Sequence, residues 1–120
     1  MAVPLAQLLH DLALLALALA YGADGDLAAV ELAVIEERLG RWVPGQDPAR
    51  VRNALREATL SYGEGLPDAQ LGALVGRLRD ALGTGERGRV LADLRALAAA
   101  DSVVRPAEEA LVRRVAAAWA

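Results

Sequence analysis

The hydrophobic residues of this chain recur every three or four positions within six segments, and short stretches rich in Gly, Pro and Asp separate these segments. Such spacing is typical of amphipathic α-helices, and no segment shows the alternating pattern of a half-buried β-strand. We therefore predict an all-α fold, a single-domain bundle of about six or seven helices that spans residues 1–120. The segments expected to be helical are, approximately, 4–21, 28–42, 48–60, 67–82, 86–100 and 106–120.

Glycine, proline and aspartate set the predicted helix boundaries. The stretch YGADGD is expected to end the first helix near Tyr21, because its glycines interrupt the apolar pattern. Asp47 followed by Pro48 indicates an N-cap with proline at the first helical position. The apolar faces predict the core, in which Val34 is expected to point inward beside Ile35. Since the chain has no Phe and only 3% aromatic residues, Leu, Ala and Val must fill most of this core.

An acidic stretch occurs twice, as ADGDLAAVE at residues 23–31 and as ADSVVRPAE at residues 100–108. An offset of 77 positions aligns the two copies and pairs Asp24 with Asp101, Glu31 with Glu108, and Trp42 with Trp119. This repeat predicts two helical hairpins related by a pseudo-twofold axis, with two further helices between them. We expect the tryptophans to hold the hairpin ends against the bundle, whereas an exposed Trp119 would mark a partner surface.

The composition excludes several classes of site. Without Cys, the chain has no disulfide, no thiolate nucleophile and no Cys-based zinc site, which fits a cytoplasmic location. A net charge of −3 gives no general affinity for nucleic acid. The apolar run Leu12–Tyr21 has ten residues; since about 20 are needed to span a bilayer, we expect a buried helix and no membrane insertion. There is no Ser–His pairing and no Gly-rich phosphate loop, so we expect no enzymatic activity.

The chain resembles the TerB-like family, which is related to the tellurite-resistance protein TerB. Two stretches, ALAYGADGDLAAVELAVIEERL and LRALAAADSVVRPAEEALVRRVA, are similar to the two halves of that family, and GERGRVLADLRALAAAD is similar to the lead-in to its second acidic turn. The resemblance covers nearly the whole chain and implies a helical bundle with a metal-associated acidic site at Asp24, Glu31, Asp101 and Glu108. One departure is Ser102, which replaces the usual Gly of the second turn.

Two interpretations of these acids are open. An Asp in an interhelical turn accepts hydrogen bonds from N–H groups of the next helix, and a Glu in the first turn interacts favourably with the helix dipole. If the two turns converge, the carboxylates repel one another unless a cation lies between them, and oxygen ligands favour Ca²⁺, Mg²⁺ or Mn²⁺. An EF-hand is excluded, because position 12 counted from Asp24 is Ile35. His10 is the only histidine, so we expect it to have a structural role.

Two functions are compatible with these features. In the first, the chain is a TerB-like, stress-associated binding module that holds a divalent cation at the acidic cluster and engages protein partners. In the second, it is a metal-free adaptor that binds a protein partner through a hydrophobic or Arg-rich surface, like the TerB-like domains attached to membrane-anchored DnaJ-type proteins. The sequence does not fix the oligomeric state or the identity of the partner.

Overall fold

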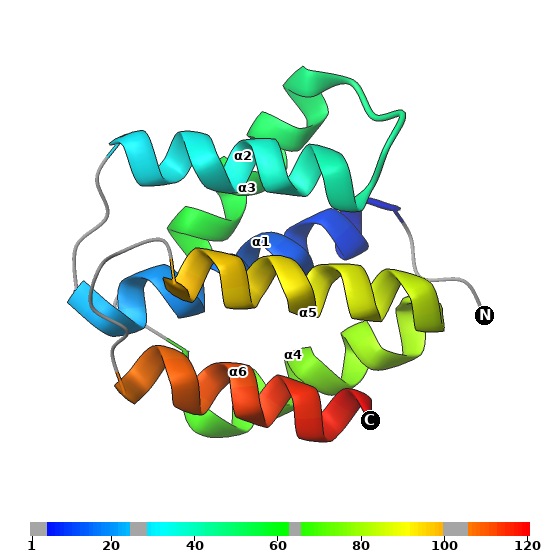
Figure 1. Ribbon diagram of the computed structural model, residues 1–120. Coiled ribbons are helices and arrows are strands. Elements are labelled where there is room, and N and C mark those ends of the chain that lie inside the picture. The colour runs from blue at the N-terminus through cyan, green and yellow to red at the C-terminus, as the bar shows by residue number, and fades with distance from the viewer. Residues whose placement is uncertain (1–4, 25–28, 63–65, 100–105) are drawn as a thin grey trace.

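Six α-helices and no β-strand make up the part of the chain that the computed structural model describes (Figure 1). That part comprises residues 5–24, 29–62, 66–99 and 106–120, of which residues 5, 20–24, 29–31, 98–99 and 106–107 are described by their backbone alone. The helices are α1 (Leu5–Asp24), α2 (Ala29–Trp42), α3 (Pro48–Tyr62), α4 (Asp68–Ala81), α5 (Thr84–Ala99) and α6 (Pro106–Trp119). The predicted all-α fold is therefore confirmed.

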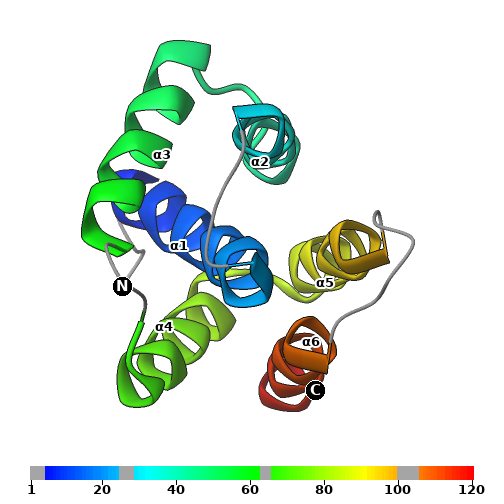
Figure 2. The same ribbon diagram turned by 90° about the vertical axis from the view of Figure 1, so that its left-hand side faces the viewer.

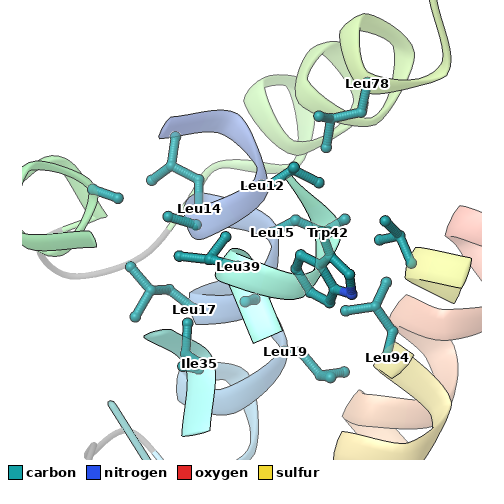
Figure 3. Packing of buried hydrophobic residues seen from close by; sticks show 14 of the residues in the cluster. Leu12, Leu14, Leu15, Leu17, Leu19, Ile35, Leu39, Trp42, Leu78 and Leu94 are labelled. Atoms are coloured by element: carbon teal, nitrogen blue, oxygen red, sulfur yellow. The ribbon is translucent and has the colours of Figure 1, made fainter. Parts of the chain in front are cut away.

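Helix α1 lies at the centre of the bundle and contacts each of the other five helices (Figures 1 and 2). Residues 12–17 are at most 7% exposed, so α1 is buried around its whole circumference rather than along one stripe. Its leucines lie among apolar residues of α2, α4 and α5, including Leu39, Trp42, Leu78 and Leu94 (Figure 3). No helix in the described ranges combines the length and the apolar character needed to cross a membrane.

Local capping interactions fix the ends of several helices. The backbone N–H of Ala49 donates to Asp47 Oδ1 at 2.9 Å, which confirms the predicted N-cap of α3. At the start of α5, the N–H of Gly83 donates to Glu86 Oε1 at 3.1 Å, which is one half of a capping box. Arg87 Nη1 then donates to the carbonyl oxygen of Arg79, in the last turn of α4, and to that of Leu82, which follows the helix, both at 2.9 Å. The polar GERGR stretch is thus the start of a helix.

Two local predictions were wrong. Helix α1 does not end near Tyr21 but continues through Gly22 to Asp24, since a single glycine weakens a helix by only about 1 kcal/mol. The first Asp of the acidic stretch therefore belongs to the last turn of α1. Val34 is 37% exposed instead of buried, because α2 turns Ile35, Leu39 and Trp42 toward the core, at i, i+4 and i+7.

Two antiparallel hairpins, α1–α2 and α5–α6, lie side by side (Figure 1). Trp42 and Trp119 are the last residues of α2 and α6, and both are buried, at 2% and 7% exposure. Trp42 Nε1 donates to Asp93 Oδ2 at 2.6 Å, and Trp119 Nε1 donates to the carbonyl oxygen of Val75 at 3.0 Å. Both tryptophans fasten a hairpin end as predicted, and an exposed Trp119 is ruled out. The pseudo-twofold relation itself stays a prediction.

Candidate functional site

The helix ends that carry the repeated acids lie at one end of the bundle. The C-terminal ends of α1 and α5 and the N-terminal ends of α2 and α6 are all at the left of Figure 1 and face the viewer in Figure 2. Asp24 is the last residue of α1, whereas Glu31 and Glu108 are each the third residue of their helices. Both glutamates therefore occupy the first helical turn, where the helix dipole favours a negative charge.

Glu108 is the member of the predicted acidic cluster whose side chain the structure describes. It is 7% exposed, and a carboxylate so far from water requires hydrogen bonds or a positive charge to compensate its lost hydration. Asp101 and Ser102 lie outside the described residues, as do the side chains of Asp24 and Glu31. The structure therefore brings the helix ends together but does not describe how the four carboxylates are arranged.

The donor set suits a hard cation, because four carboxylates offer only oxygen ligands. Among the side chains that are described, no three His, Cys, Asp or Glu residues gather as a metal-binding group. The side chains of Asp24, Glu31 and Asp101 lie outside the described part, so the cation site stays a prediction. His10 is half-buried on α1 and belongs to no such group within the described part.

Two other carboxylates, one buried and one partly buried, join helices that are distant in sequence. Asp11 of α1 is 1% exposed, and it accepts hydrogen bonds from Arg77 Nε and Nη2 of α4 at 3.2 and 3.1 Å and from Gln7 at 3.0 Å. Asp93 of α5 accepts from Arg38 Nη1 at 3.0 Å as well as from the indole of Trp42, both on α2. Their oxygens are engaged within the protein, so these aspartates are structural rather than ligands.

Sequence reasoning missed both of these aspartates. A signal was present for Asp11, which directly precedes the most apolar run of the chain and shares its helix. An acid at the edge of an all-apolar helix must find a partner on another helix. No short sequence pattern could identify Arg77 as that partner, because 66 positions separate Arg77 from Asp11.

A groove of about 450 Å³ runs between α2 and α3. Its lining residues are Leu32, Ala33, Glu36, Arg52, Leu55, Arg56, Thr59 and Leu60. A second hollow, of about 290 Å³, adjoins it and shares Ala33, Glu36 and Arg52. Leu60 on the rim is 78% exposed, the most exposed large apolar side chain among the described residues. The structure thus places an apolar hollow, with two arginines among its lining residues, between α2 and α3.

These features define a small all-helical bundle domain with a buried central helix and, at one end, two helices that each have a glutamate in the first turn. The family described as tellurite resistance protein TerB matches residues 10–119, nearly the whole chain. This chain therefore belongs to the TerB family, which confirms the resemblance found in its acidic repeats. Neither the curated proteins nor the solved structures contain a significant match to the chain.

Proposed function

We propose that this TerB-family domain is a non-enzymatic binding module that holds a divalent cation, Ca²⁺, Mg²⁺ or Mn²⁺, with Asp24, Glu31, Asp101 and Glu108. The observation that carries the proposal is the position of the helix ends: the ends of α1, α2, α5 and α6 nearest these acids lie at one end of the bundle (Figure 2). Family membership supports it independently. We further propose a cytoplasmic, stress-associated role, for which the absence of Cys is favourable.

The physical reason for a cation is electrostatic. Carboxylates that share a site repel one another, and their charges can be kept only if a cation or protons lie between them. A divalent cation would supply two positive charges and would link the α1–α2 hairpin to the α5–α6 hairpin through its ligands. Bound to the folded chain only, it would also raise the free energy of unfolding by mass action.

Calorimetric titration of the purified chain with Ca²⁺, Mg²⁺ and Mn²⁺, with Zn²⁺ as the softer comparison, tests the proposal. We expect one hard cation to bind with a Kd below about 1 mM, which corresponds to about 4 kcal/mol. Asp24→Asn and Asp101→Asn should each weaken that binding about tenfold or more. Asp80→Asn is the matched control, because Asp80 is an exposed acid on α4 whose side chain pairs with the neighbouring Arg79.

Two results would overturn the cation proposal: no cation binding tighter than about 1 mM, or variants that bind as tightly as the native chain. Weakening by Asp24→Asn alone would instead restrict the ligands to the first acidic stretch and exclude the stretch that contains Ser102. Each outcome assigns the acids a defined role.

The second candidate function is a metal-free adaptor for a protein partner, and the groove between α2 and α3 favours it. A concave apolar surface with charged residues at its edge is the usual form of a site for a protein segment. Partner binding that is equal in excess EDTA and in the presence of divalent cations would support the adaptor. Loss of binding in EDTA would support a cation-dependent module.

A further inference from the structure

We propose that the groove between α2 and α3 binds an amphipathic helix of a partner protein, which places apolar side chains in the larger hollow and a carboxylate against Arg56. The inference rests on the proposed role as a protein-binding module. The described lining residues of the groove do not include Glu108, the acid of the candidate cation site whose side chain the structure describes, and the two proposals are tested separately.

The shape of the groove suits a helix. The two hollows share three lining residues and follow α2 from Leu32 to Gly40. Eight residue steps along a helix correspond to about 12 Å, or roughly two turns of a helix lying alongside. In the helix-in-groove mode, such a segment inserts side chains spaced at i, i+3 or i+4 and i+7. The hollow lined by Leu32, Leu55 and Leu60 would receive the apolar ones.

One strongly exposed apolar side chain, Leu60, lies at this groove. An isolated exposed leucine is common in proteins, but Leu60 lies on the rim of a concave apolar surface that continues into buried Leu55. Arg52, Arg56 and Leu60 follow one another at i, i+4 and i+8, which places them in one row on α3. A partner helix that covers Leu60 therefore also meets the guanidinium groups of that row.

The charges give the groove a polarity. Arg52 Nε lies 3.0 Å from Glu36 Oε1, and this ion pair stands where the two hollows meet. Among the described residues Arg56 has no ion pair, so it is the unpaired cation of the larger hollow. Glu37, also without an ion pair in the described part, is the corresponding acid of the smaller hollow. A complementary segment carries an acid at one end and a base at the other.

This charge order also predicts the direction of the bound helix. Helices favour acidic side chains in the first turn and basic side chains in the last turn, because of the helix dipole. The partner helix should therefore lie with its N-terminal end over Arg56 and its C-terminal end over Glu37. A segment with the reverse charge order would have to bind in the opposite direction to pair its charges, and those charges would oppose its own helix dipole, which weakens the helix that it must form.

Gly40 is compatible with the close approach of a partner helix. It lines the smaller hollow, lies inside α2 and is exposed, and a Cβ built on it would meet no atom within 4 Å. No contact within the described chain therefore requires a glycine here, although glycine weakens a helix. A missing side chain on the wall of a groove allows another backbone to approach closely. Gly40→Leu would place a side chain in that space, and its Cβ would meet no atom of the described chain within 4 Å.

Fluorescence anisotropy with synthetic labelled helices tests the proposal on the full chain. One panel of peptides carries a leucine stripe with acids at the N-terminal end and bases at the C-terminal end, a second has the charges reversed, and a third has the stripe scrambled. We expect the acid-first panel to bind and the scrambled panel not to bind. Leu60→Ser and Gly40→Leu should each weaken binding about fivefold or more, because interface anchors dominate affinity.

Arg56→Glu provides the sharpest variant, since the acid of the acid-first peptides would then face a carboxylate, which should weaken their binding about three- to tenfold. The matched controls are Val34→Ser, which removes an exposed apolar side chain of α2 outside both hollows, and Arg95→Glu, which reverses an exposed charge on α5. Both controls should bind the peptides as the native chain does. Circular dichroism confirms that each variant is folded.

Three results would overturn the inference. The first is that no acid-first peptide binds with a Kd below about 1 mM. The second is that Leu60→Ser, Gly40→Leu and Arg56→Glu all bind the peptides as tightly as the native chain does. The third is a native dimer in sedimentation velocity that Leu60→Ser converts to monomer, which would make a second copy of the chain the occupant. Repeating the titrations in EDTA separates the two proposals: binding that persists supports the groove even if calorimetry finds no cation.

Discussion

Replacing Asp93 by alanine would remove the carboxylate that joins α5 to α2. One oxygen of Asp93 accepts from Arg38 Nη1 at 3.0 Å, and the other accepts from Trp42 Nε1 at 2.6 Å. Trp42 is 2% exposed, so water cannot replace the lost acceptor of its indole N–H. The side chain of Arg38 is 24% exposed, so its charge would regain only part of its hydration. The substitution thus leaves one donor unsatisfied and one cation poorly solvated.

The expected loss follows from these two groups. A buried donor without a partner costs about 1–3 kcal/mol, and a hydrogen bond to a charged group contributes about 1.5–3 kcal/mol. Because Arg38 is partly hydrated, we take the lower part of the second range and expect Asp93→Ala to lower the free energy of unfolding by about 3–4 kcal/mol. For a chain of this size, that corresponds to a decrease in Tm of roughly 10–15 °C. Asp93→Asn retains an acceptor and should cost about half as much.

Denaturation in guanidinium chloride, followed by circular dichroism and by tryptophan fluorescence, measures the change. Asp80→Ala is the control, because the Asp80 side chain is 72% exposed and pairs only with its neighbour Arg79, and it should change stability by less than about 0.5 kcal/mol. If Asp93→Ala cost less than about 1 kcal/mol, or no more than the control, the contact would be dispensable and the reasoning from burial would be refuted.

Two further substitutions test local and long-range contacts. Asp47→Ala removes the N-cap of α3 and should lower the free energy of unfolding by about 1 kcal/mol, measured in urea, whereas Asp47→Ser should restore most of it. Arg77→Ala should lower the free energy of unfolding by about 3–5 kcal/mol, and Asp11→Ala by about 2–3 kcal/mol. The first change leaves the buried carboxylate of Asp11 without its cation, whereas the second leaves a guanidinium that is half-exposed to water. Thermal unfolding that ranked these two variants in the opposite order would contradict that argument.

The sequence by itself determined the helices, because helix formation depends on residues within a few positions of one another. The 3.6-residue pattern predicted every helix, and Asp47 with Pro48 predicted where α3 begins. The repeated acidic stretches also identified the family, since they are short local patterns. One helix end was predicted wrongly because the weak effect of a single glycine competed with the rest of the helix: α1 passes through Gly22.

The tertiary structure alone decided which residues of different helices meet. Asp11 and Asp93 were ordinary acids in the sequence, and their roles come from an arginine 66 positions away and a tryptophan 51 positions away. The same is true of the groove, whose walls belong to two helices, and of Val34, which the packing of α2 leaves at the surface. Burial and pairing between helices depend on how their faces are oriented in space, and no short stretch of sequence contains that information.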